Sequence, residues 1–135
     1  MKLKKILIID DEVDITNNIK AILNDENYNS STANNSIEAI DLLNNDKFDL
    51  VILDVWLDNS ELDGIELLKK IRETSSIPII IISGHGNIEM AVQAIKEGAN
   101  EFIEKPFTSE RLLLSISRSI ELQEIKNENI QLKQK

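Results

Sequence analysis

Short apolar segments alternate along this chain with longer segments in which apolar residues recur every three or four positions. The apolar segments are expected to be β-strands, and they cover residues 4–10, 28–33, 50–54, 77–83 and 101–104. Most of these runs are continuous and do not alternate with polar residues, which is typical of strands buried on both faces of a parallel sheet. The pattern therefore predicts a parallel sheet covered by helices on both sides, with 28–33 as its most polar strand.

The segments between the expected strands have the spacing of amphipathic helices. Apolar residues share one helical face within each segment: Ile15, Ile19, Ile22 and Leu23; Ile37, Ile40 and Leu43; Ile65, Leu68 and Ile71; and, more loosely, Met90, Val92, Ala94 and Ile95. Asn35 or Ser36 is expected to cap the second helix, and Gly98 is expected to end the fourth. A strand and a helix thus alternate five times, which predicts an α/β fold with a doubly wound, five-stranded parallel sheet.

Residues 108–135 contain no glycine or proline and are expected to form one long helix. The first half of this helix has an apolar face wide enough to pack against the sheet, formed by Leu112, Leu113, Ile116 and Ile120. We therefore expect residues 1–120 to form one domain and residues 121–135 to form a C-terminal linker helix.

The linker helix carries a narrow apolar seam. Four residues follow one another at the alternating spacing of three and four positions that coiled coils use: Leu122, Ile125, Asn129 and Leu132. Glutamates and lysines flank the seam at positions that would pair across a parallel dimer: Glu121 with Lys126 and Glu128 with Lys133. The sequence therefore predicts a parallel homodimer, and the alternative is a solvent-exposed monomeric helix.

The composition is that of one globular domain, with 135 residues of which 41% are hydrophobic and 29% are charged. The chain has no cysteine and a single histidine, His85, which excludes disulfides and a histidine-rich metal site. His85 is interpreted as an exposed loop residue that tunes water access, in preference to a catalytic base. The net charge of −9 is unfavourable for contact with nucleic acid. It suits a divalent cation or a basic partner, and solubility alone would also explain it.

The apolar runs are also informative about membranes. The longest of them are far shorter than the ~20 residues that a spanning helix needs. The apolar run after the basic N-terminus is too short for a signal peptide and ends in acidic residues. We therefore expect a cytoplasmic protein with no membrane contact.

Reactive side chains end or follow four of the five expected strands: Asp10, Asp11 and Glu12 after the first, Asp54 in the third, Ser83 in the fourth and Lys105 after the fifth. Ligands of open parallel sheets bind outside the carboxyl ends of the strands, so these side chains are expected to converge. Clustered carboxylates need a positive partner, which Mg2+ or the Lys105 ammonium can provide. The alternative is that the acids only cap helices.

These residues, in this order and at roughly this spacing, resemble the receiver domains of bacterial two-component response regulators. The matching residues are Asp10-Asp11, Asp54, Asp63-Gly64, Ser83-Gly84 and Lys105-Pro106-Phe107. The resemblance covers about residues 4–120. It implies a flavodoxin-like (βα)5 fold, here extended by a C-terminal helix.

The resemblance also implies a function and a metal. Asp54 would accept a phosphoryl group from a sensor histidine kinase in a Mg2+-dependent reaction. Asp11, Asp54 and the backbone carbonyl of Trp56 would bind the ion, with Asp10 acting through water. The domain would catalyse only its own phosphorylation and dephosphorylation, so it would be a signalling domain and not otherwise an enzyme.

Three further residues have roles implied by the same resemblance. Ser83 and Lys105 would contact the phosphoryl oxygens. Phe102 would occupy the position of an aromatic switch that follows the movement of Ser83. Phosphorylation would thereby change the surface that controls an output, expected here to be transcription.

The loop at residues 55–64 departs from the pattern of most receivers. It is about two residues longer and lacks the usual proline, in which it resembles the nitrogen-regulation branch, the NtrX type more than the NtrC type. Many members of that branch continue into an AAA+ ATPase and a DNA-binding domain. We therefore expect this chain to be the N-terminal part of a larger transcriptional regulator.

Three rival functions use similar residues. An aspartyl-nucleophile phosphatase needs a second aspartate two positions after the first, where this chain has Trp56. A dinucleotide-binding domain needs a glycine-rich turn after the first strand, where this chain has acids. A receiver-like interaction or dimerisation module that is never phosphorylated stays open as the main alternative.

Overall fold

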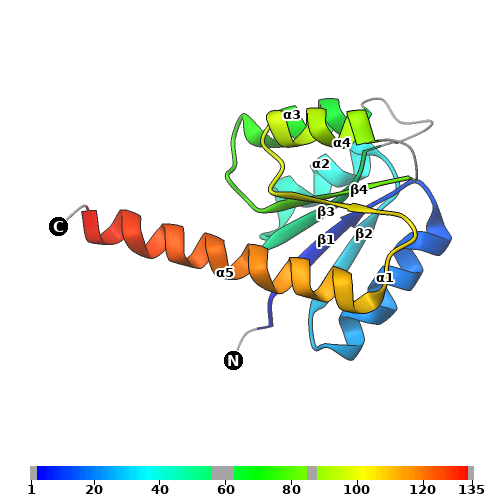
Figure 1. Ribbon diagram of the computed structural model, residues 1–135, viewed down its shortest axis with the longest axis horizontal. Helices are drawn as coiled ribbons and strands as arrows, with labels where there is room; N and C mark the ends of the chain where they lie inside the picture. Colours follow the sequence, from blue (N-terminus) through cyan, green and yellow to red (C-terminus); the bar gives the residue numbers. More distant parts are fainter. Residues whose placement is uncertain (1–2, 56–62, 85–87, 134–135) are drawn as a thin grey trace.

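The computed structural model describes residues 3–55, 63–84 and 88–133, the last five of them as backbone only. Within these residues, five strands and five helices alternate (Figure 1). The strands are β1 (Lys5–Ile9), β2 (Asn29–Ala33), β3 (Leu50–Asp54), β4 (Ile79–Ser83) and β5 (Glu101–Glu104). The helices are α1 (Val13–Asp25), α2 (Ser36–Asn45), α3 (Gly64–Arg72), α4 (Ile88–Lys96) and α5 (Ser109–Lys133).

All five strands are parallel and form one sheet in the order β2-β1-β3-β4-β5. This arrangement confirms the doubly wound fold that the sequence predicts. The order reverses direction between β1 and β3, which creates the switch point where ligands of such sheets bind. The expected strand at 77–83 begins two residues late because Pro78 has no N–H with which to continue a ladder.

Alternate side chains of the sheet enter two separate apolar layers. Leu7 of β1 packs on one face with residues of α2, α3 and α4, whereas Ile8 packs on the other face with residues of α1 and α5. Figure 1 shows the same division, with α1 and α5 on the opposite side of the sheet from the other three helices. The three central strands β1, β3 and β4 are thus buried on both faces, as their continuous apolar runs indicate, whereas the edge strands β2 and β5 are only partly buried.

Not every apolar residue on a helical face is buried. Ile37 is 61% exposed, because the small residues Ser36 and Ala39 take the positions of α2 that contact the sheet. In α4 the buried residues are likewise small, and Val92 and Ile95 remain exposed. Helical periodicity identifies the apolar face of a helix, but it does not indicate which part of that face contacts the sheet.

The N-termini of α2 and α3 have side-chain caps. The Asn35 side chain accepts a hydrogen bond from the backbone N–H of Glu38, which selects Asn35 over Ser36 as the cap of α2. Asp63 and Glu66 form a reciprocal capping box at the start of α3. After α4 the chain passes through Gly98 with a φ of 114°, as expected for a residue that ends a helix.

Helix α5 contacts the sheet through Leu112, Ile116 and Ile120 and then projects beyond it (Figure 1). Glu101, the first residue of β5, accepts hydrogen bonds from Ser115 and Arg118 of α5 at 2.9 and 2.6 Å. Within the described residues, no helix combines the length and the apolar character needed to cross a bilayer.

Candidate functional site

The reactive side chains named from the sequence meet at one edge of the sheet. Asp10 directly follows β1, Asp54 is the last residue of β3, Ser83 is the last of β4, and Lys105 directly follows β5. The backbone N–H of Lys105 donates to the carbonyl oxygen of Ser83 at 2.7 Å, so the ends of β4 and β5 are fixed side by side. The group lies at the carboxyl ends of the strands and spans the switch point.

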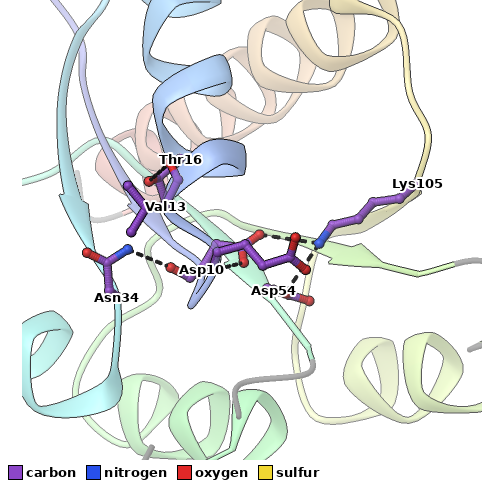
Figure 2. A network of polar contacts seen from close by, with 7 residues as sticks. Asp10, Val13, Thr16, Asn34, Asp54 and Lys105 are labelled. Atoms are coloured by element: carbon purple, nitrogen blue, oxygen red, sulfur yellow. Dashed lines mark hydrogen bonds and ion pairs between the residues drawn. The ribbon is translucent and has the colours of Figure 1, made fainter. Parts of the chain in front are cut away.

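Two carboxylates in this group share one ammonium. Lys105 Nζ lies 3.4 Å from Oδ2 of Asp10 and 3.3 Å from Oδ2 of Asp54, and Figure 2 shows the lysine side chain reaching toward both. The two aspartates are 1% and 4% exposed. Burial of two carboxylates against one cation of the described residues leaves this part of the site short of positive charge.

The titration of Asp10 reflects this shortage. Burial raises the pKa of Asp10 to about 7, and the nearby Asp54 charge also raises it, although the Glu12 N–H and the Lys105 ammonium oppose the rise. Burial lowers the pKa of Lys105, but the charges of Asp54 and Asp10 outweigh that effect and raise it overall. The lysine therefore stays an ammonium ion, and a further cation would favour ionisation of Asp10.

Oxygen ligands suited to such a cation lie beside this pair. One carboxylate oxygen from each of Asp10, Asp11 and Glu12 falls within 4.8 Å of the other two. A small, all-oxygen group that leaves room for water fits Mg2+, which usually keeps several waters. Asp54 does not belong to this three-residue group, and Trp56 lies outside the described residues, so its carbonyl cannot be placed.

Ser83 carries a buried hydroxyl at the end of β4. Its side chain is 1% exposed, and its Oγ has no hydrogen-bond partner among the residues that the structure describes. A buried hydroxyl without a partner costs free energy, about 1–3 kcal/mol. Its position at the end of β4 makes it available to an anionic group placed beside Asp54.

Gly64 controls how closely α3 approaches the end of β3. A Cβ atom at this position would lie 2.5 Å from the carbonyl oxygen of Asp54 and would also meet the backbone of Val55. Only glycine allows this approach without displacing the strand end. The Asp63-Gly64 pair quoted from the sequence thus caps α3 and at the same time fixes the backbone that carries Asp54.

Phe102 lies half-buried in β5, where it packs against the core layer on the α4 side. It also lines an open cavity of about 660 Å³ together with Ile95 of α4 and Pro106. The Lys105–Pro106 peptide bond is cis. Phe102 therefore has core on one side and space on the other, as a side chain with two positions requires.

The residues named for the coiled-coil seam can be placed only in part. Leu122 and Ile125 are 56% and 46% exposed, and both lie on α5 beyond its contact with the sheet. The side chains of Asn129 and Leu132 fall outside the described residues, as does His85. Lys4 of the domain forms an ion pair with Glu124 at 2.8 Å, so the helix is still attached to the domain at that point.

Sequence reasoning assigned no role to one residue of the site. The Asn34 side chain donates from Nδ2 to the backbone carbonyl oxygen of Asp10 at 2.9 Å, and Figure 2 shows it approaching from the side opposite Lys105. Asn34 follows the most polar strand, and its neighbour Asn35 already explains the cap of α2. The only available signal was that Asn34, like Asp10, directly follows its strand.

Comparison with known proteins places these features in a family. Residues 6–117 match the response regulator receiver domain. The chain is 48% identical over its whole length to an NtrX-like response regulator of Rickettsia bellii, and 47% identical over 96% of its length to the nitrogen assimilation regulatory protein NtrX of Azorhizobium caulinodans. It spans 28% and 29% of those two proteins.

Solved structures agree with this similarity. The crystal structure of NtrX from Brucella abortus is 43% identical over 97% of this chain, with a TM-score of 0.93, and the chain covers 30% of it. The separate receiver domain of the same NtrX is 47% identical over 86% of this chain, with a TM-score of 0.84, and 98% of that domain is covered. The similarity therefore extends over one complete domain of these proteins.

Proposed function

The chain belongs to the family of response regulator receiver domains, and we propose that Asp54 accepts a phosphoryl group from a sensor histidine kinase. The observation that carries this proposal is the buried Asp54 carboxylate at the end of β3, 3.3 Å from the Lys105 ammonium. The family is one of signalling domains, and the chemistry proposed here acts only on the domain itself.

The transfer uses Asp54 as a nucleophile. An oxygen of its carboxylate forms a bond to the phosphorus atom while the bond from phosphorus to the donor's imidazole nitrogen breaks, and the nitrogen keeps the electron pair. Lys105 stabilises the carboxylate before transfer and contacts the phosphoryl oxygens afterwards. The Ser83 Oγ–H, which has no partner among the residues that the structure describes, donates to a phosphoryl oxygen.

We propose Mg2+ as the cofactor of this step. Asp10, Asp11 and Asp54, with the backbone carbonyl of Trp56, would hold it, and the position of Glu12 in the acidic group adds one more candidate ligand. The ion, when bound, neutralises charge on the phosphoryl oxygens. The shortage of positive charge beside Asp10 and Asp54 supports this assignment.

Dephosphorylation follows from the same arrangement. Water attacks phosphorus, the bond to the Asp54 oxygen breaks, and inorganic phosphate leaves.

While the phosphoryl group is present, Ser83 bonds to it and moves toward Asp54, and Phe102 turns into the space that is freed. The half-buried position of Phe102 beside an open cavity supports this switch.

A parallel homodimer is the second part of the proposal. Leu122 and Ile125 expose apolar surface where α5 leaves the domain, and a second copy of α5 would cover it, with Asn129 and Leu132 continuing the seam.

The boundary at residues 120 and 121 separates the receiver from this linker. We place the protein in the cytoplasm, as the regulatory N-terminal part of a longer transcriptional regulator.

The direct test of the phosphoryl acceptor is a mass measurement. The protein is incubated with MgCl2 and phosphoramidate, and the intact mass is recorded for wild type, Asp54→Asn and the control Asp25→Asn, which changes an exposed acid at the end of α1. Wild type and the control should gain one phosphoryl group, and Asp54→Asn should gain none. A wild type that gains nothing would leave the non-phosphorylated interaction module as the better reading.

A further inference from the structure

The acidic residues 10–12 begin where β1 ends, and the backbone of Asp10 is still hydrogen-bonded to the sheet. Its N–H donates to the carbonyl oxygen of Ala33 at 3.1 Å, which extends the pairing of β1 with β2 by one step. Its own carbonyl oxygen accepts a hydrogen bond from Nδ2 of Asn34 at 2.9 Å. The Asn34 side chain thus takes the place of the next backbone donor of β2.

We propose that Asn34 is a positioning residue for the magnesium-binding acids at residues 10–12. The carbonyl that it binds belongs to the peptide between Asp10 and Asp11, so its direction sets the orientation of Asp11 relative to Asp10. The inference rests on the proposed function, because it assumes that these acids bind the metal. It adds a residue that touches neither the metal nor the phosphoryl group.

The other contacts of Asp10 are made by its carboxylate. Its Oδ1 accepts from the Glu12 N–H at 3.0 Å and its Oδ2 faces Lys105, so both side-chain oxygens are engaged. The bond from Glu12 links the carboxylate to the backbone two residues on, whereas the bond from Asn34 acts directly on the carbonyl oxygen of the Asp10–Asp11 peptide (Figure 2). Without the amide, the peptide leaves the ladder with no partner for its carbonyl within this set of contacts.

Asn34 is itself held in place by the start of α2. Its backbone N–H donates to Oε1 of Glu38 at 2.8 Å, and the Glu38 N–H in turn donates to Oδ1 of Asn35 at 2.9 Å. The turn between β2 and α2 therefore contributes to the site, although it supplies no acid. Groups that orient metal ligands in this way typically change metal affinity by about 10–100-fold when removed.

The test is a calorimetric titration of the whole chain with MgCl2 alone. Asn34→Ala should raise the dissociation constant for Mg2+ about tenfold or more. The matched control is Asn45→Ala, which removes an exposed asparagine amide at the other end of α2, where it bonds to Asp41 and takes no part in the contacts that hold Asn34. The control should bind Mg2+ within about twofold of wild type.

A second readout separates positioning from structural damage. The rate of Asp54 phosphorylation by phosphoramidate is followed against MgCl2 concentration. Asn34→Ala should need about tenfold more Mg2+ for half the maximal rate, and the maximal rate itself should recover to near the wild-type value. Asn34→Ser, whose shorter hydroxyl does not span the same distance, should behave like the alanine variant.

Several results would overturn the inference. Wild-type affinity in Asn34→Ala, or an equal loss in Asn45→Ala, would show that the bond to Asp10 does not matter to the metal. Failure of both Asn34 variants to fold would assign this residue to stability. If wild type gains a phosphoryl group on Asp54 without binding Mg2+, the inference fails alone, and if it gains none, the proposed function fails with it.

Discussion

Lys105 Nζ lies 3.3 Å from Oδ2 of Asp54, although β4 separates the strands from which the two residues come. The contact is made because both side chains leave the sheet at its carboxyl edge. Asp54 is 4% exposed, so this ammonium is a major stabilising partner of a buried carboxylate.

Replacing Lys105 should therefore slow transfer to Asp54. Lys105→Gln keeps a polar side chain, one atom shorter, but removes its charge, which leaves two buried carboxylates without this cation. We expect the rate of phosphorylation by phosphoramidate to fall by about tenfold or more, since charge stabilisation in the transition state is lost. Quench-flow mass spectrometry would measure it. Lys69→Gln, an exposed lysine of α3, is the control, and equal rates in both variants would remove Lys105 from the reaction.

Gly64→Ala should displace the backbone that carries Asp54, because the added methyl group meets the Asp54 carbonyl oxygen at 2.5 Å. Overpacking of this kind typically costs about 1–3 kcal/mol of unfolding free energy, measured by urea denaturation. The same variant should phosphorylate Asp54 more slowly. Gly98→Ala is the matched control, because its positive φ makes alanine unfavourable far from the site. A stability loss in both variants with an equal fall in rate would contradict a specific role for Gly64.

The protein should lose stability in acid as Glu101 becomes protonated. Burial would raise the pKa of Glu101, but hydrogen bonds from Arg118 and Ser115 and the charges of Arg118 and Arg111 lower it overall. The stability from this cluster is thus present above the ordinary pKa of a glutamate and is lost as the pH falls through the lowered pKa of the folded protein. Urea denaturation from pH 6 to pH 3 should show a shallower decline for Glu101→Gln than for wild type.

The control for that pH series is Glu89→Gln, which changes an exposed acid in the first turn of α4. It should decline as steeply as wild type. If the Glu101 and Glu89 variants decline in parallel with wild type, the contacts from α5 do not stabilise the ionised form of Glu101.

The seam on α5 should produce a dimer that depends on concentration. Leu122→Asp combined with Ile125→Asp places charges on the two exposed apolar residues and should abolish dimerisation in equilibrium sedimentation. The apolar seam must supply most of the affinity, because exposed charge pairs add only ~0.2–1 kcal/mol each. Asn127→Asp, at an exposed position of the same helix, should dimerise like wild type. A chain ending at Ile120 that dimerises as strongly as the full chain would move the interface to the receiver.

Ser83→Ala should separate phosphorylation from its structural consequence. The variant keeps Asp54 and Lys105, so it should still gain one phosphoryl group, but it lacks the hydroxyl that draws β4 toward that group. Amide chemical shifts of α4 and β5, including Phe102, should then change much less on phosphorylation than in wild type. Ser109→Ala, at the start of α5, serves as the control. Undiminished shifts in Ser83→Ala would contradict the proposed switch.

Much of this site could be predicted from the sequence, because the carboxyl ends of parallel strands all lie at the same edge of the sheet. Once 50–54 and 101–104 are recognised as strands, Asp54 and Lys105 must emerge at the same edge, and the structure has both strands at those bounds. Asn34 was missed because its contribution depends on a carbonyl direction, which no residue pattern encodes. Ile37 was placed with the inward-facing residues because periodicity defines a stripe but not its rotation against the sheet. The roles of Trp56, Asn129 and Leu132 stay predictions.

The long helix also has a mechanical consequence. Helix α5 is uninterrupted for 25 residues, and among the side chains that the structure describes its contacts with the domain extend as far as Gln123 and Glu124. The nine residues that follow Glu124, about 14 Å of helix, convert a tilt of about 10° at that point into a sideways shift of about 2 Å at the tip. Small rotations at the receiver would therefore be carried along the helix, without further moving parts, to whatever is attached at its far end.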